Sequence, residues 1–388
     1  MTRFDEKLIL VPIAFQYDYE HRAREGLMRF IKRYNPGWCL QFPQWPVEAH
    51  GSEMLFDERV AGLLFTSPVL RTLPDRERLR QTGKPVVCIG HAVDGFTSID
   101  ANDRAVARLA FEHLRSRGFR RFAFFHDESW FPFQARQKVF RQTVLDAGLA
   151  FIEQPEWDAE SLWHGPERLA PLARWVDGLP RPIAIFAGNV ERAFTLLTVC
   201  RERGVHVPDE IAVLGCDQNE TICSLATPPL STIDHGMVSV GFEAAALLHR
   251  MIRGEQIPPE HRTVEPAGVI ERQSTSSVMV EDPALSEAAS FIEEHALSGI
   301  TAADVAAEAS ISRRRLEMSF KQQFGRTIHQ QILHRRIEHA KHLLTDTDLK
   351  MPEIATWCAF SCPTHLQHTF KKLVGTTPGV YRRQHRSA

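Results

Sequence analysis

The sequence predicts a two-lobed α/β region followed by an all-α domain, and three observations support this. From residue 7 to about 272, six short apolar strings alternate with amphipathic stretches of helical period. Such alternation is typical of doubly wound parallel sheets, in which crossover helices cover both faces of each strand. After a Ser/Thr-rich stretch the periodicity is helical only, and this last region contains an internal repeat. A length of 388 residues suits two or three domains.

The α/β region is long enough for two such sheets in tandem. Parallel sheets bind ligands at the C-terminal ends of their strands, so two sheets whose strand ends face each other would form a small-molecule sensor with a central cleft. The predicted strands are 7–15, 60–67, 84–90, 120–127, 182–188 and 210–217, and the predicted helices are 19–34, 74–82, 102–117, 134–148 and 190–204.

The internal repeat predicts two helix-turn-helix motifs. TAADVAAEASISRRRLEMSFKQQFGRT (301–327) aligns with MPEIATWCAFSCPTHLQHTFKKLVGTT (351–377), and five identical residues lie 50 positions apart, among them Leu316 and Leu366. Each copy has a short helix with small residues, a turn and a longer helix with apolar residues four apart.

The charge distribution indicates that the repeat meets a polyanion. Residues 1–282 carry 32 lysines and arginines against 38 acidic residues, whereas residues 311–388 carry 14 against five, a formal charge of +9. In a helix-turn-helix the second helix enters the major groove, so long donors and short polar groups are expected at its start. Both copies fit, and we expect Ser312 and Ser361 to cap these helices. Three consecutive arginines alone are more often a solvated surface, but the repeat and the charge favour DNA binding.

Other protein classes are less compatible with the sequence. No stretch approaches the roughly 18 apolar residues of a membrane span. Two acidic residues in the N-terminal segment and seven cysteines, mostly in apolar strings, suit the cytoplasm. The alternative function is an enzyme of carbohydrate metabolism on the same fold, but no GxGxxG, GxxxxGK[ST] or GxSxG motif occurs. His334, Glu338 and His342 could bind zinc or simply form a polar helix face, and we expect no metal and no cofactor.

The last 100 residues resemble the AraC family of bacterial transcription regulators. The resemblance lies in the paired motifs, the connecting RRIEHAKHLL and the closing FKKLVGTTPGVYR. Pro363 and Cys362 depart from the family pattern, although proline is tolerated in a first helical turn. The resemblance implies base-reading positions on both longer helices. We expect DNA contacts from Arg313, Arg314, Glu317 and Met318 in the first copy and from Thr364, His365, Gln367, His368 and Lys371 in the second, with Lys371 on a phosphate.

The preceding region resembles the sugar-sensing domains of LacI-type repressors, which are similar to periplasmic sugar-binding proteins. The matching segments are SIDANDRAVARLAFEHLRSRGFRRFAFF, HVPDEIAVLGCDQNE and PLSTIDHGMVSVGFEAAALLHRMIRG. A sensor of this type followed by an AraC-type tail is the arrangement of xylose operon regulators. It implies a periplasmic-binding-protein-like sensing and dimerisation domain at 1–273, a linker at 274–283 and a DNA-binding domain at 284–388. The expected partners are operator DNA, a sugar, most readily D-xylose, and a second copy of the chain.

Sugar hydroxyls require bidentate acceptors and forked donors, and aromatic faces cover the C–H surface of the ring. The resemblance implies that Asp217 holds the sugar just after a strand and that Arg136 donates to adjacent hydroxyl groups. Any single candidate can instead be a helix cap or part of a surface ion pair. The further candidates are Asn189, the loop residues Asp18, Tyr19 and Glu20, and the aromatic residues Trp130, Phe131 and Phe133.

Overall fold

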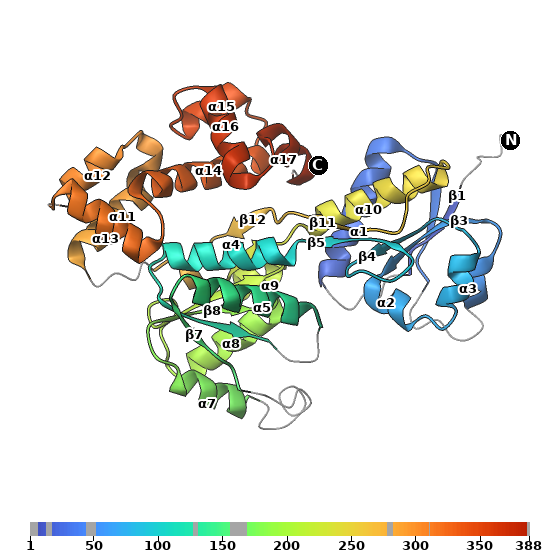
Figure 1. Cartoon of the computed structure of the whole chain (residues 1–388), viewed down its shortest axis with the longest axis horizontal. Helices are drawn as coiled ribbons and strands as arrows, with labels where there is room; N and C mark the ends of the chain where they lie inside the picture. Colours follow the sequence, from blue (N-terminus) through green and yellow to red (C-terminus); the bar gives the residue numbers. More distant parts are fainter. Residues whose placement is uncertain are drawn as a thin grey trace. The chain divides into compact units, whose positions relative to one another are not determined.

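The computed structural model describes residues 7–12, 18–43, 52–126, 131–155, 169–277, 282–309 and 311–385. It divides into two compact units, one comprising Met1–Asn102 and His235–Pro266 and the other Asp103–Asp234 and Ala267–Ser387. We call the first unit the first lobe. The second unit contains an α/β part, the second lobe (103–234 and 267–277), and a helical domain (282–385) (Figure 1). No helix in these ranges is long and apolar enough to cross a membrane.

The first lobe is a six-stranded sheet in the order β11-β5-β4-β3-β1-β2, and all its neighbouring strands are parallel. Its core lies on both faces: Leu63 and Phe65 pack with α2 and α3, whereas Leu64 packs with α1 and α10. The elements are β1 Lys7–Leu10, α1 Asp18–Tyr34, β2 Trp38–Gln41, β3 Val60–Thr66, α2 Ser67–Thr72, α3 Arg76–Gln81, β4 Val86–Ile89, β5 Thr97–Ala101, α10 Met237–Ile252 and β11 His261–Val264.

Helices α1 and α10 approach so closely that two glycines are required at their contact. A Cβ atom on Gly26 would lie 1.9 Å from the carbonyl oxygen of Val238, and one on Gly241 would lie 1.8 Å from that of Ala23. Both obstacles are main-chain atoms, so no side-chain rotation relieves the overlap.

We therefore expect Gly241→Ala to lower the free energy of unfolding by at least about 1 kcal/mol, because the two helices must separate to admit the methyl group. Gly178→Ala is the matched control, since no heavy atom lies within 4 Å of its added Cβ. Urea denaturation of both variants measures the difference. Equal midpoints would contradict the close packing of α1 on α10.

The second lobe has the sheet order β12-β10-β9-β8-β6-β7, in which all pairs are parallel except β10 with β12. Helices α4 and α5 cover one face of the sheet, and α7 and α8 cover the other. The elements are α4 Asp103–Ser116, β6 Arg121–Phe125, α5 Phe131–Asp146, β7 Ala150–Ile152, α7 Ala170–Gly178, β8 Ile183–Ala187, α8 Val190–Glu202, β9 Ile211–Cys216, α9 Glu220–Leu225, β10 Ser231–Asp234 and β12 Gly268–Ile270.

The helical domain contains the two predicted helix-turn-helix motifs, joined by α14 (orange to red in Figure 1). Leu316 and Leu366 are fully buried, each in the core of its own copy. Gly325 and Gly375 cap the second helices with φ of 75° and 83°, a conformation that favours glycine. The helices are α11 Pro283–His295, α12 Ala302–Glu308, α13 Arg313–Phe324, α14 Ile328–Asp346, α15 Met351–Trp357, α16 Pro363–Val374 and α17 Pro378–His385.

One local expectation was wrong. Ser361 does not cap α16, because the helix begins at Pro363 with Cys362 at the N-cap, and the Ser361 hydroxyl lies 3.2 Å from His365 Nδ1 instead. Ser274, expected at the start of the linker, is fully buried in the second lobe, where its hydroxyl donates to the Val213 carbonyl at 2.6 Å. Ser312 does stand at the N-cap of α13, although its side chain makes no capping hydrogen bond.

Candidate effector site and nucleic-acid interface

The second lobe brings several predicted sugar residues to one edge of its sheet. Strands β6, β8 and β9 are adjacent and parallel, so their C-terminal ends lie side by side. Asn189 follows β8 after one residue, and Asp217 follows β9 directly. Arg136 comes from α5, which starts six residues after β6 ends. This edge is therefore the candidate effector site of the second lobe.

Arg136 is a buried cation with a fixed orientation. Its side chain is only 7% exposed, its Nε donates to Asp103 Oδ1 at 2.6 Å, and one Nη donates to the Gly188 carbonyl at 2.9 Å. Burial acts to lower the pKa of Arg136, but Cys216, Asp103 and Asp217 outweigh it, so the pKa is raised. Within the described residues, the contacts with Asp103 and Gly188 leave the second Nη for a ligand hydroxyl, which gives a pre-oriented donor.

Asp217 adopts a backbone conformation that few residues other than glycine tolerate. Its φ is 83°, and its N–H donates to the Ile233 carbonyl of β10 at 3.1 Å. The left-handed region costs a residue with a Cβ about 1–2 kcal/mol, although aspartate and asparagine tolerate it best. Such strain is concentrated at functional sites, and here it accompanies a half-buried carboxylate at a strand end.

Asn189 has a structural role as well. Its side-chain oxygen accepts the Arg192 N–H at 2.9 Å and so caps α8. The sequence had left a helix cap as the alternative to ligand binding, and the cap is formed. The amide NH₂ group is the part of Asn189 that can still donate to a ligand.

Three candidates belong to the first lobe, and one expectation about them was wrong. Asp18, Tyr19 and Glu20 form the first turn of α1 and not a loop. The Tyr19 hydroxyl donates to Glu20 Oε1 at 3.4 Å, and Glu20 is 1% exposed. Trp130 lies outside the described residues, as do the side chains of Phe131 and Phe133 at the start of α5.

Sequence reasoning missed several polar residues at the second-lobe edge. Asp103, at the start of α4, orients Arg136 as described above. His126, immediately after β6, is buried, and its Nε2 lies 3.1 Å from Gln137 Oε1 on α5. Gln137 follows Arg136 directly in the sequence, and this adjacency was the available signal.

The residues predicted to read DNA lie on the outward faces of α13 and α16. On α13, Arg314 and Met318 are exposed, and Arg313 is held by an ion pair from its Nε to Glu317 Oε1 at 2.8 Å. On α16, all five predicted residues are exposed: Thr364, His365, Gln367, His368 and Lys371. Leu316 and Phe320 of α13 and Leu366 and Phe370 of α16 are buried, so the opposite face of each helix is available to a duplex.

Helix α14 sets the separation of the two motifs. Its 19 residues make a rod of about 28 Å, which is close to the ~34 Å of one turn of B-DNA. Arg336 of α14 is buried and donates to the carbonyls of Ala296 and Ile300, which joins α14 to the segment between α11 and α12. Glu338, which was weighed as a zinc ligand, pairs with Lys341 at 2.9 Å.

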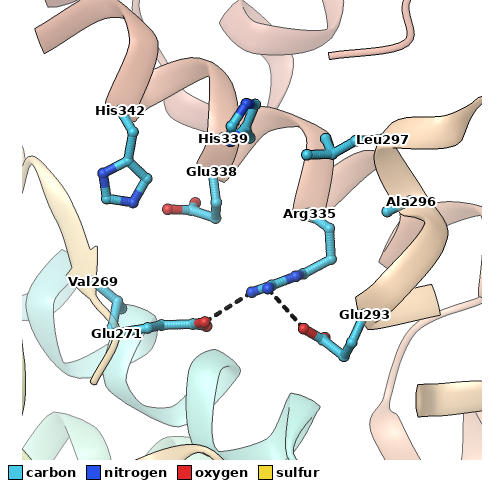
Figure 2. Close-up of a pocket in the computed structure, with 9 residues that line it drawn as sticks. All are labelled: Val269, Glu271, Glu293, Ala296, Leu297, Arg335, Glu338, His339 and His342. Carbon is cyan, nitrogen blue, oxygen red and sulfur yellow. Dashed lines mark hydrogen bonds and ion pairs between the residues drawn. The ribbon is translucent and has the colours of Figure 1, made fainter. Parts of the chain in front are cut away.

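The second lobe and the helical domain meet at a cluster of alternating charges (Figure 2). Glu271 binds Arg117 at 2.5 Å and Arg335 of α14 at 2.8 Å. Glu293 of α11 binds Arg335 at 2.7 Å and lies 3.7 Å from Arg117. Burial acts to raise the pKa of Glu271, but its cationic neighbours, foremost Arg117, outweigh it and lower the pKa. Both domains thus contribute an arginine and a glutamate to one balanced cluster.

Further contacts tie the same two parts together. Tyr381 of α17 is buried, and its hydroxyl donates to the Ala267 carbonyl at 2.5 Å. The side-chain amide of Gln323, near the end of α13, donates to the Gly118 carbonyl at 3.0 Å. The first recognition helix is therefore connected directly to the segment that follows α4.

The second lobe is expected to lose stability in mild acid. His113 of α4 is 3% exposed, and its Nε2 lies 2.9 Å from Thr275 Oγ1. Burial lowers its pKa to about 3, so it is neutral at pH 7. Because the unfolded chain takes up this proton near pH 6.5, the free energy of unfolding should fall by about 2 kcal/mol between pH 6.5 and 5.

Urea denaturation at pH 7 and pH 5 tests this expectation, with His113→Gln as the comparison, since glutamine has no proton to gain in this range. The variant should lose about 2 kcal/mol less than the wild type on acidification. The same loss in both proteins would show that His113 is not the group responsible.

Comparison with known proteins supports both halves of this description. Residues 111–275 match a periplasmic binding protein-like domain, and residues 305–384 match a helix-turn-helix domain. The chain has a TM-score of 0.60 with the structure of the xylose-binding transcription activator XylR, at 27% identity and with 98% of each chain covered. The lac repressor dimer bound to operator and an anti-inducer shares the fold, with a TM-score of 0.55 at 18% identity over 71% of this chain and 95% of that chain.

Two bacterial regulators are similar to the chain over most of their length. The xylose operon regulatory protein of Escherichia coli strain K12 is 32% identical over 320 residues, which are 79% of this chain and 80% of that protein. The corresponding protein of Haemophilus influenzae is 28% identical over 383 residues, 94% and 95% of the two chains. The chain therefore belongs to the family of xylose operon regulatory proteins, and it is a sugar-responsive DNA-binding transcription regulator and not an enzyme.

Proposed function

We propose that the effector is D-xylose or a closely related pentose, held at the strand ends of the second lobe. The observation that carries this proposal is the pairing of a buried, oriented arginine with a strained aspartate at one sheet edge. Arg136 donates to a ring hydroxyl, and Asp217 accepts from one or two. Asn189 adds a donor, while Asp18, Tyr19 and Glu20 of the first lobe and Trp130 complete the proposed set.

The proposed DNA contacts are the nine residues named above on α13 and α16, with the bases read near the helix starts and Lys371 on the backbone. We further propose that the chain acts as a homodimer, as the lac repressor does in its operator complex. A sensing domain over 1–273, a linker over 274–283 and a DNA-binding domain over 284–388 complete the division, although Ser274 and Thr275 pack with the second lobe. We also propose a cytoplasmic location, because operator DNA is found there.

Sugar binding is proposed to reach the DNA through the charged cluster of Glu271, Arg117, Arg335 and Glu293. A ligand shifts a conformational equilibrium only by its different affinities for the two states. Through these ion pairs the second lobe is bound to α14, the helix that joins both motifs. A change in the lobe is therefore transmitted to the spacing or the presentation of α13 and α16.

A thermal-shift panel of pentoses and hexoses tests the choice of effector. We expect D-xylose to raise the melting temperature most, because a ligand at 100 times its Kd adds about 2.7 kcal/mol to the stability of the native state. The sugar should be recovered unchanged afterwards. Stabilisation by hexoses alone would contradict the proposed pentose, and conversion of the sugar would favour an enzyme.

A further inference from the structure

A large groove on the second unit lies apart from the residues proposed to bind sugar or DNA. Its volume is about 860 Å³, within the range of small-molecule pockets. One wall is formed by α4 and α5 of the second lobe, and the other by the end of α13 together with α14 and the end of α16. None of the residues proposed to bind sugar or DNA lines it.

The groove carries an excess of positive charge. Arg104, Arg108 and Arg115 follow one another at spacings of four and seven residues, which places them on one face of α4. Of the acidic residues in the walls, Glu338 is already paired with Lys341 and Asp146 accepts from Gln142. The ionisable lining residues are Arg104, Arg108, Arg115, Lys138, Arg326, Lys341 and His334 against Glu112, Asp146 and Glu338.

Two arginines in this groove lack a carboxylate partner within the described part of the chain. Arg326, half-buried after α13, donates only to the main-chain carbonyl of Glu112, at 3.3 Å. The Nε of Arg115 is buried and has no hydrogen-bond partner among the residues described. Burial lowers the pKa of both arginines, and the nearby Glu112 and Glu338, which act to raise that of Arg326, do not offset the burial. Partly buried cations that lack an ion-pair partner are costly, so an anion between them would be favoured.

We propose that this groove binds a small phosphate-bearing molecule, held between Arg326 of the helical domain and Arg108 and Arg115 of α4. A guanidinium group can donate two parallel hydrogen bonds to phosphate oxygens. Three guanidinium groups on two facing walls offer more N–H donors than the two oxygens of a carboxylate need, which favours a phosphate group. Because the walls belong to the second lobe and to the end of the first recognition helix, the occupant bridges them. The groove is thus a second effector site, separate from the sugar site, that modifies DNA affinity.

Calorimetry and thermal shift on the full chain test this proposal, with inorganic phosphate and pyrophosphate as probes at constant ionic strength. Pyrophosphate should bind and raise the melting temperature more than chloride does. Arg326→Gln should weaken this binding at least tenfold. Arg108→Gln should weaken it as well; this residue is exposed and has no partner in the described ranges, so its loss leaves the fold intact. Arg201→Gln on α8, exposed and outside the groove, should change nothing.

Two results would overturn the proposal. One is equal pyrophosphate affinity in the wild type, Arg326→Gln and Arg108→Gln, or no binding at all. The other is that Arg108→Gln weakens binding to a duplex of random sequence and makes its salt dependence shallower while pyrophosphate has no effect. The groove would then hold backbone phosphates of DNA, and the proposed small ligand would be wrong. Neither result affects the sugar site, which the pentose panel tests independently.

Discussion

Asp217→Asn is expected to weaken sugar binding about 10- to 150-fold. A hydrogen bond to a charged acceptor contributes about 1.5–3 kcal/mol, and the amide removes the charge while keeping the shape. Asparagine also tolerates the left-handed backbone conformation at this position, where φ is 83°. Calorimetric titration of the variant with D-xylose measures the effect, and Asp94→Asn, an exposed residue of the first lobe, is the control.

Comparing Asp217→Ala with Asp217→Asn separates the effect of residue 217 on sugar binding from its effect on stability. Alanine pays the full backbone strain of about 1–2 kcal/mol, so this variant should be less stable than Asp217→Asn without sugar, while both lose the ligand response. Sugar affinity of Asp217→Asn within twofold of the wild type would refute the assignment of Asp217 to the effector site.

Arg314→Ala is expected to cost about 1–3 kcal/mol in operator binding and to relax the preference at one base pair. Arg314 is exposed near the start of α13, two residues before the buried Leu316, and no acidic residue in the described ranges pairs with it. Arg313, by contrast, is paired with Glu317, so Arg313→Ala should have a smaller effect on base preference.

Lys371→Ala is expected to reduce DNA affinity without changing the base preference. This lysine lies in the last turn of α16, where a phosphate contact is expected, so its loss should weaken all sequences alike and make the salt slope shallower by about one unit. The affinities of Arg314→Ala and Lys371→Ala for an operator and for its point variants, measured at several salt concentrations, distinguish the two roles. If Arg314→Ala weakens every sequence equally, the arginine only anchors a phosphate.

The architecture was predictable because its core positions follow local periodicity. Leu316 and Leu366 repeat at a fixed offset, and the apolar strings of β3, β6, β8 and β9 are buried on both faces. Strands β5 and β10 were missed because they read TSIDA and STID. The hydroxyl groups of these strands can be buried because they form hydrogen bonds with residues far away in the sequence. Ser231, for example, donates to the Arg272 carbonyl. No local sequence pattern predicts a polar strand that is stabilised in this way.

The same limit applies to the sites. Arg136 and Asp217 were proposed from their position after predicted strands, but Asp103, which orients Arg136, lies 33 residues earlier in the chain. The charged cluster joins Arg117 to Arg335, more than two hundred residues apart, so only the folded chain reveals it. Loop and cap geometry at Ser361 also escaped prediction, because a neighbouring cysteine and proline shift the helix start.

We expect sugar binding in the second lobe to change the affinity of the helical domain for DNA. The quantity to measure is the Kd of the full chain for an operator duplex, selected from random sequences, with and without saturating D-xylose, in the wild type and in Asp217→Asn. The Kd should change at least about fivefold in the wild type, as coupling free energies of 1–3 kcal/mol give, and not at all in the variant at the same sugar concentration. An operator affinity that xylose leaves unchanged in the wild type, or shifts equally in both proteins, would refute this coupling.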